Sequence, residues 1–145
     1  MSNIYVGIDI GSVSANTVVL DSDKNILEEH YTRTNGEPLE TGLKELENIV
    51  EKYGEDSISI IATSGSAGKV IAPMLGASFS NEVIAQAKAI EYYHPEVKTV
   101  IEMGGQDAKL IILDSVEGTD KVRIEDFQMN SVCAAGTGSF LDQQA

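Results

Sequence analysis

Hydrophobic and polar residues follow a pattern whose period changes along the chain. Three apolar runs, at 4–10, 15–20 and 26–32, are separated by turn residues and predict a three-stranded meander. Leucine, isoleucine and valine then recur at helical spacing from Pro38 to about Tyr53. The chain is therefore expected to begin with three strands and a helix.

The pattern continues with shorter elements and then returns to strands. The expected elements are, in order, a buried strand at 57–63, a loop at 64–68, a short helix to about Met74, a brief strand at 77–79 and a helix over 82–92 that Asn81 caps. Strands at 97–102, 108–113 and 121–127 follow, and a loop of small residues over 130–139 leads into the start of a final helix. The later strands thus repeat the opening meander.

Residues 8–22, IDIGSVSANTVVLDS, are echoed by residues 101–115, IEMGGQDAKLIILDS. The identical pairs are Ile8/Ile101, Gly11/Gly104, Ala15/Ala108, Leu20/Leu113, Asp21/Asp114 and Ser22/Ser115. Each copy reads as an apolar strand that ends in a carboxylate, then a glycine turn, then a second apolar strand. Because internal repeats reveal architecture, this one indicates a duplicated nucleotide-binding fold. Two such hairpins, facing one another across a cleft, would hold a metal-bound phosphate.

The order of elements predicts an α/β fold. It fits a ribonuclease-H-like lobe followed by the start of a second such lobe, with mixed sheets and flanking helices. The joint is expected near Pro95, which gives one lobe at 1–95 and another at 96–145. The sequence stops inside a starting helix without a C-cap signal, so we expect a truncated second lobe and a fragment of a longer chain.

The charge of the chain narrows the classes of partner. A formal charge of −13, from 10 Lys and Arg against 23 Asp and Glu, argues against general binding of nucleic acids or anionic membranes. Backbone amides and a metal ion still allow an anionic nucleotide to bind locally. No apolar run approaches the roughly 20 residues that span a bilayer. The N-terminus lacks a signal-peptide pattern, so a cytoplasmic location is expected.

The first hairpin carries a candidate phosphate site. Asp9 stands where the first strand ends, and a carboxylate there is predicted to hold Mg²⁺ through water, as a catalytic group. The turn residues predicted to contact the nucleotide are Gly11, Ser12, Val13 and Ser14. The alternative is an ordinary hairpin in which Asp9 is a partly solvated turn residue.

The second hairpin repeats the device with Glu102, Gly104, Gly105, Gln106 and Asp107. Its adjacent glycines predict a loop of exposed amides around a second phosphate. Glu102 and Gln106 are predicted to be catalytic, with Gln106 orienting an attacking water, and Asp107 to join the metal shell. A tight hairpin is again the alternative, but two copies with the acid in place favour phosphate binding.

Among the other residues that could bind a metal or act in catalysis, only one cysteine suggests a function. Glu82 is explained by the dipole at the start of its helix, and His30 and His94 have no companion ligands at metal spacing. Cys133 stands among small residues just before a helix, where a lowered thiol pKa suits metal ligation. A buried inert thiol is the alternative. An iron–sulfur cluster needs four thiolates in the usual case, so other chains or later cysteines would supply the rest.

The segments GIDIGSVSANTVVL, IEMGGQDAKLIIL and MNSVCAAGTGSFLD resemble a known family. It is the BadF/BadG/BcrA/BcrD-type ATPases, which include the ATP-dependent activators of 2-hydroxyacyl-CoA dehydratases and the benzoyl-CoA reductase ATPase subunits. They belong to the acetate kinase, sugar kinase, Hsp70 and actin superfamily. The resemblance covers nearly the whole chain, and the segment around Cys133 is its most specific part, because kinases of the same fold do not share it.

The resemblance implies roles for the residues and partners for the protein. Asp9 and its turn match the first phosphate motif, and residues 104–107 match the second. Cys133 matches the first of two cysteines per subunit that hold one [4Fe–4S] cluster across a homodimer interface, and Gly136 begins the helix leading to the nucleotide. ATP and Mg²⁺ would drive one-electron transfer from the cluster to a dehydratase or reductase partner. The electron donor would be ferredoxin or flavodoxin.

Some features depart from the family pattern, and other functions stay open. Glu102 stands where an aspartate is expected, and the second cysteine and most of the second lobe would lie beyond Ala145. We therefore expect this chain alone to bind nucleotide weakly and to hold no stable cluster. The alternatives are a small-molecule kinase of the sugar type and a nucleotide-responsive regulatory domain without turnover.

Overall fold

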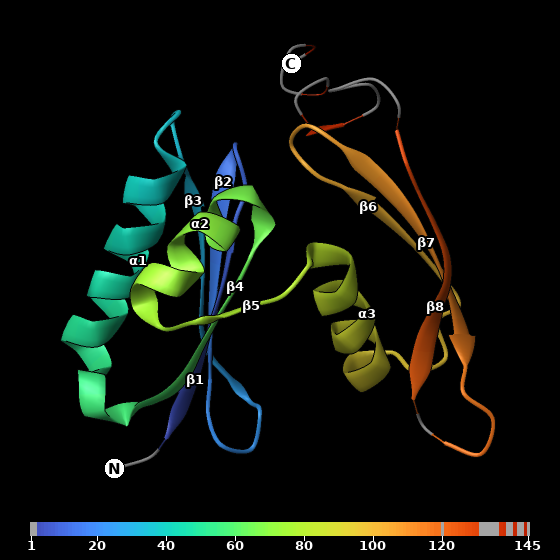
Figure 1. The fold of residues 1–145 in the computed structure, drawn as a ribbon, viewed down its shortest axis with the longest axis horizontal. Coiled ribbons are helices and arrows are strands. Elements are labelled where there is room, and N and C mark those ends of the chain that lie inside the picture. The colour runs from blue at the N-terminus through green and yellow to red at the C-terminus, as the bar shows by residue number, and fades with distance from the viewer. Residues whose placement is uncertain (1–2, 120, 131–136, 139–140, 142–143, 145) are drawn as a thin grey trace. The chain divides into compact units, whose positions relative to one another are not determined.

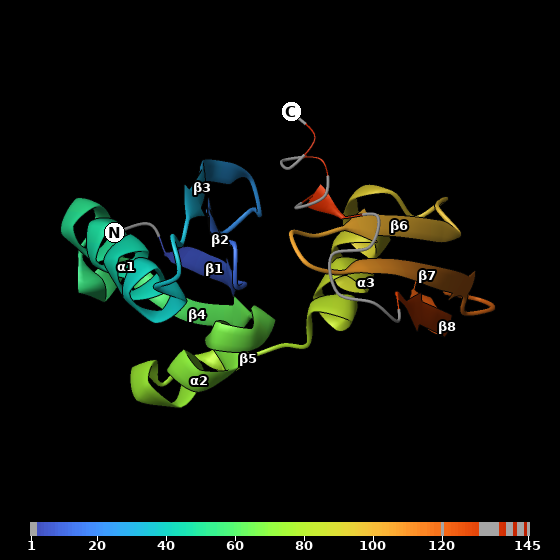
Figure 2. The same cartoon turned by 90° about the horizontal axis from the view of Figure 1, so that it is seen from above.

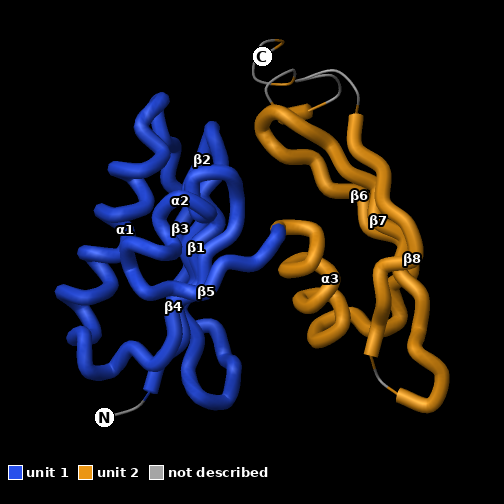
Figure 3. Tube along the Cα trace, viewed as in Figure 1, with its two compact units in different colours: residues 1–81 blue, residues 82–145 orange. Residues whose placement is uncertain are grey.

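The computed structural model describes residues 3–119, 121–130, 137–138, 141 and 144. The chain forms two compact units, 1–81 and 82–145 (Figure 3). The division falls ahead of helix α3 (Glu82–Tyr93), whereas the sequence placed the joint after this helix, near Pro95. The helix therefore belongs with the strands that follow it.

In the described part of the first unit, a mixed sheet of five strands carries helices on one face (Figures 1 and 2). The strands are β1 (Ile4–Ile10), β2 (Ser14–Leu20), β3 (Ile26–Arg33), β4 (Ile58–Ser64) and β5 (Ser78–Phe79). Their spatial order is β3-β2-β1-β4-β5, with β1 to β3 antiparallel and β4 and β5 added in parallel. The helices are α1 (Pro38–Tyr53), α2 (Gly65–Leu75) and a 3₁₀ turn, η1 (Glu55–Ser57).

Alternate residues of β1 form the centre of the first core. Ile8 and Ile10 are buried with Ile49 of α1 and Ile71 of α2. Gly42 of α1 lets the helix approach closely, because an added Cβ would lie 2.4 Å from Ile10 Cδ1. Successive strand residues point to opposite faces of a sheet, so the intervening positions of β1 face away from the two helices.

One predicted loop was wrong. The sequence suggested a loop at 64–68, but α2 already begins at Gly65. The small residues serve close packing instead: Ala67 is buried, and a Cβ on Gly68 would lie 3.3 Å from the Cβ of Thr63 on β4. A run of small residues is typical of a loop, but here it allows a tight contact between a helix and a strand.

The second unit repeats the opening meander beneath its own helix. Its strands are β6 (Thr99–Met103), β7 (Ala108–Ser115) and β8 (Val122–Met129), antiparallel in that order. Val83 and Ala87 of α3 form a core with Ile111 and Leu113 of β7. This packing explains why α3 groups with the later strands. No helix in the described residues is long and apolar enough to cross a membrane.

The sequence repeat is also a structural repeat. The strand pairings nearest the two turns are Asp9↔Asn16 and Ile10↔Ala15 in the first hairpin, and Glu102↔Lys109 and Met103↔Ala108 in the second. Both turns close with the same backbone bond: Gly11 N–H donates to Ser14 C=O (3.0 Å), and Gly104 N–H to Asp107 C=O (2.9 Å). The two copies therefore share register and turn geometry.

Candidate functional site

Asp9 lies one residue before the end of β1, on the sheet face opposite α1 and α2. Its neighbour in the parallel register of β4 is Ser64, whose hydroxyl donates a hydrogen bond of 2.8 Å to Asp9 Oδ1. Sequence reasoning missed Ser64, because a serine at a strand end carries no signal until the two strands are known to be adjacent. The bond orients the carboxylate that is predicted to hold Mg²⁺.

Gly65 leaves space beside this carboxylate. It has a φ of 79°, and an added Cβ would lie 2.4 Å from the carbonyl oxygen of Ile10 and 2.8 Å from Asp9 Oδ1. Glycine is therefore required both by the backbone conformation and by the close approach. Mg²⁺ takes one or two carboxylates and keeps several waters, so an oriented carboxylate with no side chain over it suits this ion.

The first turn is held by its own backbone and by a buried threonine. The Gly11 N–H is used in the bond to Ser14 described above. Thr34 Oγ1 donates to the carbonyl oxygen of Ser12 (2.6 Å), and Thr34 N–H donates to that of Val13 (2.9 Å). Because a trans peptide places its C=O and N–H on opposite sides, the Val13 N–H points away from Thr34. The contact of this turn with a phosphate stays a prediction.

Lys109 contacts three carboxylates at the second hairpin, and the sequence alone did not predict this role. Its Nζ lies 2.9 Å from Glu102 Oε2, 2.9 Å from Asp107 Oδ1 and 3.1 Å from Glu82 Oε1. The signal was present, because Lys109 alternates with Ile111 and is a polar residue at a core-facing position of β7. The side chain is only 3% exposed.

The carboxylates predicted for catalysis and metal binding are thus held by an ammonium group. Burial by itself would lower the pKa of Lys109, but hydrogen bonds with Glu102, Asp107 and Glu82 outweigh it and raise the pKa above its usual value. Lys109 is therefore charged at neutral pH. Within the described ranges, no group of three His, Cys, Asp or Glu side chains is placed to hold a metal ion. The roles of Glu102 and Asp107 stay predictions.

The glycines of the second turn permit this arrangement. A Cβ on Gly104 would lie 3.0 Å from Asp107 Oδ1 and 3.2 Å from Glu102 Oε1, so glycine lets the two carboxylates approach. The side chain of Gln106 is exposed, and its predicted role with an attacking water stays a prediction.

Residues 137 and 138 dock on this turn. The Gly138 N–H donates to the carbonyl oxygen of Gly104 (2.9 Å), and Thr137 Oγ1 donates to that of Gly105 (3.2 Å). Thr137 is 1% exposed. Residues 137 and 138 are therefore bonded to the turn of the second hairpin. Cys133 and Gly136 themselves lie outside the described residues, so their roles stay predictions.

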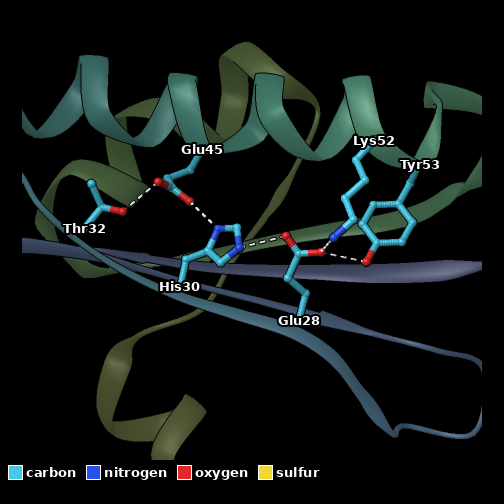
Figure 4. Close-up of polar contacts among 6 residues, drawn as sticks. All are labelled: Glu28, His30, Thr32, Glu45, Lys52 and Tyr53. Atoms are coloured by element: carbon cyan, nitrogen blue, oxygen red, sulfur yellow. Dashed lines mark hydrogen bonds and ion pairs between the residues drawn. The ribbon is translucent and has the colours of Figure 1, made fainter.

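His30 belongs to a separate polar network between β3 and α1 (Figure 4). Its Nδ1 lies 3.0 Å from Glu45 Oε2, and its Nε2 lies 2.7 Å from Glu28 Oε1. Glu28 also accepts bonds from Lys52 and from Tyr53 Oη. The hydrogen bond with Glu45 is the main cause that raises the pKa of His30, although partial burial opposes it. The network ties the edge strand to the helix.

The β3-β2-β1-β4-β5 sheet and the duplicated acid-tipped hairpin place the protein among ribonuclease-H-like ATPases of the actin and Hsp70 type. Residues 6–145 match the BadF/BadG/BcrA/BcrD ATPase family, and the chain belongs to this family. The predicted fold class and the resemblance drawn from the sequence are both confirmed.

Three relatives illustrate the similarity. The chain is 35% identical to the activator of lactoyl-CoA dehydratase of Anaerotignum propionicum, covering 97% of this chain and 52% of the relative. It is 35% identical to the (R)-2-hydroxyglutaryl-CoA dehydratase activating ATPase of Acidaminococcus fermentans, covering 100% and 54%. The solved activator of the 2-hydroxyisocaproyl-CoA dehydratase from Clostridium difficile, with bound ADPNP, superposes with a TM-score of 0.75 at 29% identity, covering 99% and 50%. The chain spans about half the length of the curated relatives that it matches.

Proposed function

We propose that this chain supplies both phosphate motifs of an ATP-dependent reductive activator. The activator would serve a 2-hydroxyacyl-CoA dehydratase or a partner like benzoyl-CoA reductase. The observation that carries the proposal is the duplicated hairpin, which keeps an acid and a glycine turn in the same register in both copies. Family membership and the names of the activators described above support the same function.

In the first motif, Asp9 would hold a magnesium-bound water while Ser64 fixes its orientation. The amide of Val13 would meet a phosphate oxygen, since Thr34 turns the neighbouring carbonyl groups toward itself. Mg²⁺, when bound, neutralises negative charge that develops on the phosphates.

In the second motif, exposed Gln106 would orient the attacking water, and Glu102 and Asp107 would act near the metal. The redox half of the proposal rests on Cys133, which would supply one thiolate to a [4Fe–4S] cluster shared across a homodimer. Hydrolysis of ATP would then be coupled to transfer of one electron to the partner enzyme. Ferredoxin or flavodoxin would be the donor.

Nucleotide binding is tested by calorimetry with ADPNP and Mg²⁺. Asp9→Ala should weaken the affinity by about tenfold or more, because the variant loses a carboxylate that binds metal. Asp23→Ala is the matched control, since it removes an exposed carboxylate of the turn after β2. Equal affinity of wild type and Asp9→Ala would contradict the role of Asp9.

The redox half needs the full-length protein, purified without oxygen. We expect visible absorption and an EPR signal of a reduced cluster, both lost in Cys133→Ala. Colourless, iron-free protein would refute electron transfer while leaving ATP binding intact. ATP turnover that rises with a sugar acceptor, and not with a redox partner, would instead favour a kinase.

A further inference from the structure

Lys109 joins three separate parts of the second unit. Through Glu102 it contacts β6, through Asp107 it contacts the second turn, and through Glu82 it contacts the first residue of α3. The equivalent position of the first hairpin is occupied by Asn16, whose Nδ2 lies 3.5 Å from Ser14 Oγ. The link to a helix is therefore a property of the second copy.

The ammonium group has no spare donor in this arrangement. A lysine ammonium carries three N–H groups, and each of the three carboxylates lies within 3.1 Å of Nζ. A phosphate can accept a bond from Lys109 only if a carboxylate gives one up. Similarly, a cation that binds Asp107 or Glu102 must compete with Lys109 for the same oxygens.

We propose that Lys109 is a positioning residue that couples occupancy of the second phosphate motif to the first turn of α3, through release of Glu82. The inference rests on the proposed nucleotide binding at this motif.

Glu82 is the partner that leaves. It is the one of the three that lies outside the hairpin, on α3, and its contact with Lys109 is the longest. Its side chain is 41% exposed, against 24% for Glu102. Water therefore reaches this carboxylate more readily than it reaches Glu102, and release of Glu82 leaves both contacts within the hairpin in place. Glu82 is also the residue at which the chain enters the second unit. Its release frees the first residue of α3 from the second hairpin.

The first experiment measures ADPNP and Mg²⁺ affinity by calorimetry in the full-length protein. If the nucleotide must displace Glu82, then Glu82→Gln removes that competition and tightens binding, by about fivefold. Glu96→Gln removes an equally charged but exposed side chain and should change nothing. Lys109→Met should weaken binding, and Lys109→Arg should restore part of it. Unchanged or weaker binding by Glu82→Gln overturns the proposal, because a merely structural carboxylate would not oppose the ligand.

The second experiment needs no nucleotide and separates this inference from the proposed function. Amide hydrogen exchange is followed at 86–89, whose N–H groups bond to carbonyls of the first turn of α3, and at 104–107. Lys109→Met should raise exchange in both segments together, while Lys88→Met, on the exposed side of α3, should not. A change confined to one segment refutes the coupling. If no variant binds nucleotide, the proposed function fails and this inference fails with it. If nucleotide binds but the two segments do not change together, this inference alone fails.

Discussion

The Ser64 hydroxyl donates a hydrogen bond to Asp9 across two adjacent parallel strands. The carboxylate is thus oriented by the protein before any metal arrives. An orientation set in advance lowers the cost of ordering the site upon binding.

Ser64→Ala should therefore weaken binding of ADPNP with Mg²⁺, but less than Asp9→Ala does. Loss of one hydrogen bond to a carboxylate is worth about 1 kcal/mol, or roughly fivefold in affinity. Calorimetry measures the difference. Ser22→Ala, which truncates an exposed turn serine, serves as control, and an equal effect of both substitutions would argue against an orienting role.

Gly65→Ala should destabilise the first unit by about 2 kcal/mol or more. The added methyl group meets the Ile10 carbonyl, and its φ of 79° is unfavourable for alanine. Gly36→Ala is a matched control, because Gly36 also has a positive φ but an added Cβ meets nothing within 4 Å. Urea unfolding compares the two, and a similar loss of stability in both would mean that the close contact at Gly65 costs little.

The pH dependence of stability should carry a contribution from His30. Its pKa is raised in the folded protein, chiefly by Glu45, so the folded state binds this proton more tightly than the unfolded state. The contribution is fully present below the unfolded pKa of about 6.5 and is lost as pH rises through the higher folded pKa. Stability from urea unfolding should therefore fall across that window.

His30→Gln should flatten this fall, whereas His94→Gln, at an exposed histidine, should leave it in place. Glu28 acts in the opposite direction at lower pH. Its pKa is lowered by hydrogen bonds from Lys52 and Tyr53, so its contribution is lost as pH falls through the folded pKa. If the stability of His30→Gln falls with pH as steeply as that of the wild type, other groups control the pH dependence in this range.

Much of the fold could be predicted because its strands and long helix have clear periods. The hairpin repeat could be recognised in the sequence, and the two hairpins have the same strand register in the structure. The boundary between the units depends on the packing of Val83 and Ala87 of α3 against β7. The sequence around Pro95 carries no signal of that contact. The start of α2 was missed because small residues indicate both loops and tight packing.

The candidate site was predictable only in part. Local spacing identified the acids and glycines of both turns, which lie where each first strand ends. The groups that orient or neutralise them come from elsewhere: Ser64 from β4, Thr34 from beyond β3, and Glu82 from α3. Their roles depend on which elements become neighbours, and a single sequence does not contain that information explicitly.

The matching positions of Asn16 and Lys109 show how a duplicated element can diverge without changing shape. The side chain opposite the acid takes no part in the backbone pairing of the hairpin, and both copies keep one register and one turn bond. The two residues give the copies a different local charge on the same backbone pairing. A lysine at this position is stable only where carboxylates surround it, because burying an unpaired ammonium group is costly.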